Sequence, residues 1–309
     1  MFGIHNPVRS DSVSRFRGCL LGLACGDAVG TSVEFKKRGA FKPLGDMVGG
    51  GPFGLEAGEW TDDTSMALCL GTSLLEKKGF DAEDQMQRYC RWQDEGYLSS
   101  NGECFDIGIA VSSALSAFKR SGDPYSGSSH PRSAGNGSIM RLAPVPMYFF
   151  QSLDATLYNA VESSRTTHGT QECLDACLYF ALVLHRALSG ASKEEILAPC
   201  EPGLVKSPSI QDIADGNYFS KPREEISGSG YVVQSLEAAL WCFHQTDSFR
   251  EAILLAANLG DDADTTAAIC GQVAGAFYGE KGIPKEWLKK LVMAKEIRQM
   301  ADGLERANQ

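Results

Sequence analysis

The chain has 309 residues, of which 43% are hydrophobic and 22% are charged, and its formal net charge at pH 7 is −10. A chain of this length and hydrophobic content can bury a large core, so an ordinary folded protein is expected. Acidic residues outnumber basic ones, 39 to 29, and no basic run is long enough to follow a phosphate backbone, which argues against a nucleic-acid partner.

Residues 1–15 predict a short irregular N-terminal tail, followed by one domain over residues 16–309. The first predicted helix covers residues 16–29, where glycines recur at positions 18, 22, 26 and 30. Four-residue spacing puts these glycines on one helical face, where the backbone of a neighbouring element can approach closely.

Apolar side chains at helical spacing predict the next helices, at residues 64–77, 107–119, 172–188, 231–244 and 265–277. The helix at 265–277 repeats the small-residue spacing, with glycines at 271, 275 and 279. Ser192 and Ser248 each begin a capping-box pattern before an apolar run, and Pro284 opens a last helix with a buried stripe.

Strand signals are nearly absent, because no pair of alternating runs flanks a tight turn. Three segments rich in Gly, Pro and Ser, at residues 36–59, 121–138 and 199–230, are predicted as loops. Loops of this length inside a helical domain commonly carry function. The predicted fold class is therefore all-α: a compact, single-domain orthogonal helical bundle with long functional loops.

Three features bear on where the protein works. No run of about 18 apolar residues is present, so no membrane-spanning helix is expected. The sequence MFGIHNPVRSDSVSRF at the start contains no hydrophobic segment of signal-peptide length. The ten cysteines include no CxxC pair and lie mostly in apolar stretches, which is typical of buried thiols in a reducing compartment. These features predict a cytoplasmic protein.

Two clusters of Thr and Asp each come directly before a predicted helix, WTDDT at residues 60–64 and GDDADTT at residues 260–266. Either cluster alone would be explained as a helix cap. If the two helix starts meet, however, four or five carboxylates converge and cannot all stay ionised without a cation. Ligand sets made only of oxygen select a hard ion such as Mg²⁺, Mn²⁺ or Ca²⁺, and four carboxylates suit two divalent ions.

Six motifs occur in an order that resembles the ADP-ribosylglycohydrolases: GCLLGLACGDAVG (18–30), WTDDT (60–64), GNGSIMR (135–141), THG (167–169), SGYV (229–232) and GDDADT (260–265). The chain most resembles the bacterial dinitrogenase reductase-activating glycohydrolase type, which acts on ADP-ribosyl-arginine. The resemblance implies an all-α domain over residues 16–309 with a two-metal centre, holding Mg²⁺ or Mn²⁺. It also implies an ADP-ribosylated protein as substrate and ADP-ribose as product.

The resemblance also implies roles for particular residues. By motif match, the metal ligands are Thr61, Asp62, Asp63, Asp262, Asp264 and Thr265. Glu34 matches a family glutamate near the metals. The candidates for the catalytic base are therefore Glu34 and two of the metal-ligand aspartates, Asp63 and Asp262. Asp106 matches the acid that meets the substrate guanidinium. The residues matched to ADP-ribose binding are Asn136, Gly137, Ser138, His168 and Tyr231.

Each of these residues also has a purely structural interpretation. Glu34 would be a solvated loop acid, and Asp106 would cap the helix at 107–119. His168 would be a hydrogen-bonded structural histidine, and the Asn-Gly of residues 136–137 would form only a turn. Tyr231 would be a core aromatic on its helix. Arg141 would balance either a phosphate or an internal acid.

The predicted reaction is hydrolysis of the N-glycosidic bond between ADP-ribose and a modified arginine. Positive charge grows on the ribose in the transition state, so a net negative site is favourable. Four aspartates offset two divalent cations, and Glu34 then makes the site negative. Two alternatives stay open: hydrolysis of a serine- or acyl-linked ADP-ribose, and a non-catalytic ADP-ribose-binding protein of the same fold. Asp106 favours arginine over the neutral linkages.

Overall fold

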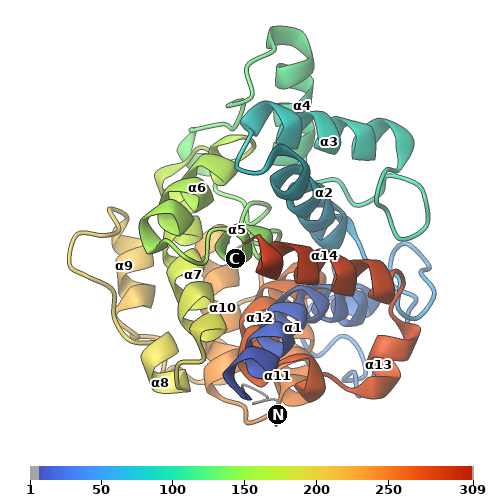
Figure 1. The fold of residues 1–309 in the computed structure, drawn as a ribbon. Helices are drawn as coiled ribbons and strands as arrows, with labels where there is room; N and C mark the ends of the chain where they lie inside the picture. Colours follow the sequence, from blue (N-terminus) through green and yellow to red (C-terminus); the bar gives the residue numbers. More distant parts are fainter. Residues whose placement is uncertain (1–6, 308–309) are drawn as a thin grey trace, which may run out of the picture.

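Two helices that come from opposite ends of the chain lie side by side at the centre of the molecule, α1 (Pro7–Gly30) and α12 (Ala263–Tyr278) (Figure 1). The glycines of α1 face α12, and a Cβ atom on Gly22 would lie within 3.0 Å of the Gly271 carbonyl oxygen. A Cβ atom on Gly271 would collide equally with the Gly22 carbonyl oxygen. The predicted close backbone approach is confirmed, and its partner is the second glycine-rich helix.

The computed structural model describes residues 7–307. Within this range it contains fourteen α-helices and no β-strand, so the prediction of an all-α, single-domain protein is confirmed. Four 3-10 helices connect them, η1 (Thr31–Val33), η2 (Pro131–Ser133), η3 (Arg223–Glu225) and η4 (Glu280–Gly282). The other α-helices are α2 (Asp62–Lys77), α3 (Ala82–Glu95), α4 (Ile109–Ser121), α5 (Pro144–Tyr148), α6 (Leu153–Arg165), α7 (Gln171–Ser189), α8 (Lys193–Ile196), α9 (Pro208–Ala214), α10 (Val232–His244), α11 (Phe249–Ala257), α13 (Lys285–Lys290) and α14 (Ala294–Arg306).

The prediction of an irregular tail over residues 1–15 is wrong for residues 7–15, which form the first turns of α1. Residues 1–6 of that tail lie outside the described part of the chain. Pro7 suits the first helical position, but the following residues are poor helix formers, so tertiary contacts decide. The guanidinium of Arg15 donates to the Leu188 carbonyl at 2.8 Å, and Arg17 pairs with Asp302 at 2.6 Å.

The other predicted helices are present, with two differences. Helices α3, α5, α6 and α9 were not predicted, and α9 lies within the segment 199–230 that was predicted as a loop. Helix α3 is mostly polar, and only a narrow stripe of Met86, Tyr89 and Trp92 is apolar and buried. The last predicted helix is divided, because Met293 adopts a left-handed conformation (φ 55°) between α13 and α14. Ser192 makes the predicted capping box, and Ser248 caps α11 by accepting from the Glu251 amide.

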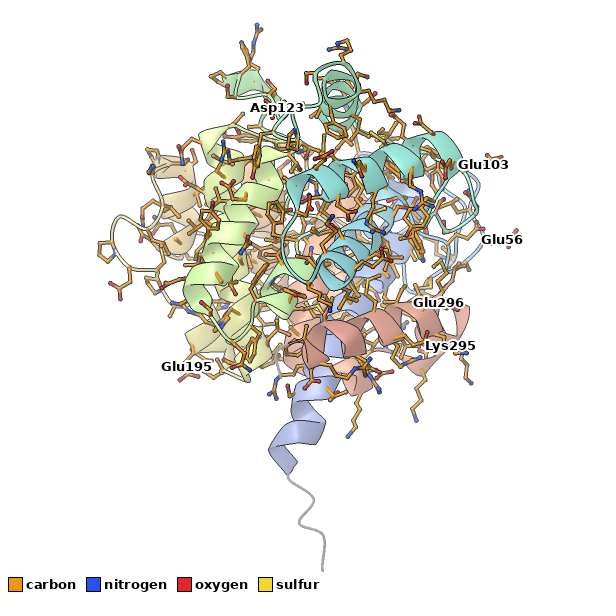
Figure 2. All side chains as sticks on the ribbon, turned by 45° about the horizontal axis from the view of Figure 1, so that its top comes forward. Glu56, Glu103, Asp123, Glu195, Lys295 and Glu296 are labelled. Atoms are coloured by element: carbon orange, nitrogen blue, oxygen red, sulfur yellow. The ribbon has the colours of Figure 1, made fainter. Side chains whose placement is uncertain are left out.

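Most charged side chains point outward from the periphery of the molecule, as Glu195, Lys295 and Glu296 do (Figure 2). No helix in the described range is both long and apolar enough to cross a membrane. Buried carboxylates are the exception to this distribution. Several lie where the start of α12 approaches the starts of η1 and α2, and the candidate site is found there.

Candidate active site

The two Thr/Asp clusters meet in space, as predicted. Thr61 caps the start of α2, and its Oγ1 lies 3.3 Å from the Asp264 carboxylate at the start of α12. Likewise, Thr265 Oγ1 of α12 lies 3.3 Å from the Asp63 carboxylate of α2. Two helix N-termini therefore face each other, and each favours negative charge through its free amides and dipole.

Asp27 is a central residue of the site that the sequence analysis did not single out. It is fully buried in the last turns of α1 and accepts four hydrogen bonds. Thr61 donates its amide and hydroxyl, both at 2.9 Å, and Thr64 donates its amide at 3.1 Å and its hydroxyl at 2.6 Å. Asp27 therefore fixes the start of α2 against α1. The available signal was an acid in an otherwise apolar, glycine-rich helix.

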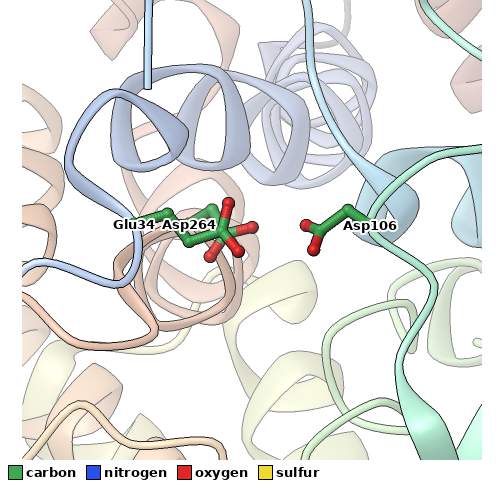
Figure 3. A group of neighbouring side chains, drawn as sticks. All are labelled: Glu34, Asp106 and Asp264. Atoms are coloured by element: carbon green, nitrogen blue, oxygen red, sulfur yellow. The ribbon is translucent and has the colours of Figure 1, made fainter. Parts of the chain in front are cut away.

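Glu34, Asp106 and Asp264 form a compact acidic group, in which one carboxylate oxygen from each residue lies within 4.8 Å of the others. Glu34 directly follows η1, Asp106 comes from the loop before α4, and Asp264 lies in the first turn of α12. Figure 3 shows the Asp106 carboxylate facing those of Glu34 and Asp264 from a separate segment of the chain. Asp106 thus lies closer to the predicted metal ligands than its motif alone indicated.

Burial and mutual repulsion raise the pKa values of these acids. Burial, with the charges of Asp106 and Asp262 next in importance, raises the pKa of Glu34 to about 9. Burial also raises the pKa of Asp106 to about 7, although hydrogen bonding to Asp264 and Glu34 lowers it. The pKa values of Asp62, Asp63 and Asp264 lie well above their usual range for the same reasons, burial first and neighbouring carboxylates second.

The donor set fits a divalent cation. No Lys or Arg in the described part of the chain pairs with these acids. Three buried carboxylate oxygens, on Glu34, Asp63 and Asp264, have no hydrogen-bond partner. Buried carboxylates without partners are unfavourable unless they are protonated or bind a cation, and a set of hard oxygen donors is what Mg²⁺ and Mn²⁺ prefer.

The acidic group opens into a cavity of about 840 Å³. A second cavity of about 1300 Å³ adjoins it and shares Ile109, Ala110, Gly135 and Gly230 as lining residues. Among the predicted site residues, the smaller cavity is lined by Glu34, Asp62, Asp106, Asn136, Gly137, His168, Asp262 and Thr265. Tyr231 lines only the larger cavity. The two cavities adjoin as one elongated space, with the acidic group at one end.

The loop at residues 135–138 lies against His168. Asn136 donates through Nδ2 to the Asp262 carboxylate at 2.6 Å and to Ser235 Oγ at 3.0 Å, so it positions Asp262. A Cβ atom on Gly137 would lie 2.8 Å from His168 Cε1, which leaves room only for glycine. Ser138 is buried beneath the loop and does not line the cavity.

His168 is held in place by its neighbours. Arg141 Nη2 donates to Thr167 Oγ1 at 2.7 Å, and Thr167 Oγ1 lies 2.8 Å from His168 Nδ1. Burial lowers the pKa of His168 to about 3. His168 is thus neutral, and its Nε2 edge borders the cavity beside Gly137.

The structure rules out the purely structural interpretations of Asp106 and Tyr231 and shows what Arg141 contacts. Asp106 is not a helix cap, because α4 begins at Ile109 with Gly108 as its N-cap. Tyr231 is not a core aromatic: 38% of its surface is exposed and its hydroxyl donates to Glu172 at 2.6 Å. Arg141 lines neither cavity and pairs with no acid in the described part of the chain. It is fully buried and contacts hydroxyl groups, a carbonyl and the ring of Tyr89.

The all-α fold and this acidic cavity agree with the comparisons with known proteins. The chain belongs to the ADP-ribosylglycohydrolase family, whose sequence model matches residues 9–309, and it is a glycohydrolase. It is 48% identical to ADP-ribosylarginine hydrolase Tri1 of Pseudomonas putida over 95% of this chain and 78% of that protein. It is 31% identical to ADP-ribosyl-(dinitrogen reductase) glycohydrolase of Rhodospirillum rubrum over 94% and 95%, respectively.

A solved structure supports the same assignment. The chain resembles an "ADP-ribosylglycohydrolase-related protein complex" with a TM-score of 0.86 and 42% sequence identity, over 97% of this chain and 100% of that one. The predicted resemblance to this family is therefore confirmed.

Proposed function

We propose that this glycohydrolase cleaves the N-glycosidic bond between ADP-ribose and a modified arginine, with two divalent cations, Mg²⁺ or Mn²⁺, at the acidic group. The observation that carries the proposal is the position of Asp106. Its carboxylate faces those of Glu34 and Asp264, and Asp106 lines the smaller cavity. A carboxylate that could pair with a guanidinium therefore lies next to oxygens that could bind a metal. The Pseudomonas putida relative is an ADP-ribosylarginine hydrolase by name, which supports the arginine linkage.

The residues that would hold the cations are Thr61, Asp62, Asp63, Asp262, Asp264 and Thr265. Their oxygens lie at the two facing helix starts, and those of Asp63 and Asp264 include buried atoms without a partner. When bound, divalent cations supply positive charge that holds ribose hydroxyls and makes a water molecule more acidic. Asn136 keeps Asp262 oriented through its 2.6 Å hydrogen bond.

The elongated space suits an ADP-ribose unit with its reacting ribose at the acidic end. The backbone amides of Gly137 and Ser138, together with His168 in its Nε2–H form, would donate to the diphosphate, because these N–H groups are uncharged donors at or beside the cavity wall. The side chain of Ser138 is buried, so this residue would take part only through its backbone. Tyr231, at the wall of the larger cavity, would contact the adenine.

The chain's own acids then perform the proton transfers. Glu34 carries a buried oxygen without a partner and would accept the proton of the attacking water, with Asp63 and Asp262 as the other candidates for the base. Negative charge from this group stabilises the oxocarbenium-like ribose. Asp106 would hold the departing guanidine through paired hydrogen bonds to its nitrogens. A neutral serine or acyl linkage gains nothing from that acid.

The proposed partner is an ADP-ribosylated protein, and the proposed compartment is the cytoplasm. All ten cysteines are free thiols, and eight of them are buried, which suits a reducing environment.

Binding of Mn²⁺ by calorimetry tests the metal site. Asp264→Asn removes one charge at the start of α12 and should abolish both Mn²⁺ binding and release of ADP-ribose from arginine. Asp154→Asn is the matched control, since Asp154 is an exposed acid in the first turn of α6, and it should leave both unchanged. Full turnover in EDTA, or undiminished Mn²⁺ binding by Asp264→Asn, would refute the metal assignment.

A further inference from the structure

Three phenylalanine rings form a row beside the acidic group. Phe35 directly follows Glu34, and Phe105 directly precedes Asp106. Phe53 lies between them, with ring centroids 6.5 Å from Phe35 and 5.2 Å from Phe105. The row therefore connects the same two segments that supply the facing carboxylates of Glu34 and Asp106.

Phe35 is exposed and its backbone is strained. Its side chain is 68% exposed, and its φ of 62° lies in the left-handed region, which a bulky residue rarely adopts. Two backbone hydrogen bonds to Asp261 hold this conformation. The Phe35 amide donates to the Asp261 carbonyl at 2.7 Å, and the Asp261 amide donates to the Lys36 carbonyl at 2.8 Å. Burial cannot explain this strain, because the ring is mostly in solvent. Strain of this kind is typical of residues kept in place for function.

The loop that carries Phe53 is anchored to the segment that carries Glu34. Phe53 belongs to a loop in which Gly49, Gly50, Gly51 and Gly54 all have positive φ values. Gly51 packs so closely on Thr31, just before Glu34, that a Cβ atom there would collide with the Thr31 carbonyl. The loop is thus anchored there, and the rings of Phe53 and Phe35 meet at an interplanar angle of 73°.

Phe35 and Asp106 line the same small cavity, and together they match the two surfaces of a guanidinium. A guanidinium group is flat and weakly hydrated; it stacks on aromatic faces while its nitrogens bond to a carboxylate at its edge. Adenine is the less suitable occupant, because Phe35 lines only the acidic cavity, whereas Tyr231 lines only the other one.

We propose that Phe35, supported by Phe53 and Phe105, determines linkage specificity by packing against the guanidinium plane of an ADP-ribosylated arginine while Asp106 pairs with its nitrogens. This inference rests on the proposed arginine hydrolase function. A serine or acyl linkage presents neither a planar cation nor a row of N–H donors, so the ring and the acid together favour arginine.

The test compares substitutions of Phe35 using two measurements, KM for an ADP-ribosylarginine peptide and Kd for free ADP-ribose. Phe35→Ala should raise KM roughly tenfold and leave the Kd for ADP-ribose within about twofold. Phe35→Tyr keeps the ring and should restore most of the wild-type KM. Phe35→Gly should behave like Phe35→Ala and melt no lower than wild type, because glycine adopts a φ of 62° without strain. Val48→Ala is the control, since Val48 is an exposed residue outside the cavity.

The outcomes separate the two proposals. If wild type cleaves the arginine linkage but Phe35→Ala and Phe35→Gly keep its KM, the specificity inference fails and the proposed function stands. An equal loss of affinity for free ADP-ribose also overturns the inference, because Phe35 would then contact the ADP-ribose unit. If wild type cleaves only serine or acyl linkages, the proposed function fails, and with it the inference.

Discussion

Asp106 is the residue on which the linkage assignment depends, and Asp106→Asn tests it. Asparagine adopts the left-handed conformation that Asp106 has (φ 59°), and it removes one charge from a repulsive group, so the melting temperature should not fall. Turnover of ADP-ribosyl-arginine should drop tenfold or more, since a charged hydrogen bond is worth roughly 1.5–3 kcal/mol. Both rates, on arginine and on a neutral linkage, are measured on one preparation. Equal losses on the two substrates would show that Asp106 does not recognise the guanidinium.

Sequence motifs predicted residues that the fold brings together, but not the contacts between them. The two Thr/Asp clusters predicted a shared acidic centre, because each had the same composition before a helix. Asp27 was overlooked because its partners, Thr61 and Thr64, are 34 and 37 residues away, and no local pattern records such a pairing. The left-handed backbone conformation of Phe35 could not be predicted either, because it depends on hydrogen bonds to Asp261, which is distant in the sequence.

The α1–α12 pair places the site, because Asp27 lies in the last turns of α1, Glu34 follows η1 directly after that helix, and Asp264 lies in the first turn of α12. Gly22→Ala should therefore destabilise the protein. The added methyl would meet the Gly271 backbone, and overpacking of this kind costs about 1–3 kcal/mol, more than the gain in helix propensity. Gly45→Ala is the control, since a Cβ atom there has no neighbour within 4 Å. The free energy of unfolding in urea checks both, and equal values for the two variants would contradict this packing.

Helical periodicity predicted most of the long helices but missed α3, α5, α6 and α9. The glycine spacing identified the contact face of α1 but not its partner, because packing between distant segments leaves no mark in local sequence. Helix α3 was missed because its buried stripe is narrow. The start of α1 was placed too late, because contacts to Leu188 and Asp302 extend it beyond its own propensity.

For the whole molecule, the acidic group predicts a pH-dependent stability that metal reverses. In metal-free protein, the pKa values of Asp27, Asp106 and Glu34 rise to about 6, 7 and 9, above the value near 4 in an unfolded chain. The folded state then binds more protons, so the free energy of unfolding should fall as pH rises from about 4 to about 9. Mn²⁺ binds the ionised carboxylates and should stabilise the protein most at the upper end of this range.

Thermal melts across this pH range, in EDTA and in Mn²⁺, check this prediction. The separation between the two curves should widen with pH in wild type and shrink in Asp264→Asn. Parallel curves at all pH values would show that these carboxylates do not share a cation.

If this protein is a metal-dependent hydrolase of ADP-ribosyl-arginine, its activity should depend on both the linkage and the metal. Release of ADP-ribose is followed from peptides carrying the arginine, serine and acyl linkages, each with Mg²⁺, with Mn²⁺ and with EDTA. We expect rapid release from the arginine peptide with either metal, little from the other two, and none in EDTA. Release from the serine or acyl peptide at an equal or greater rate, or release that continues in EDTA, would contradict the account.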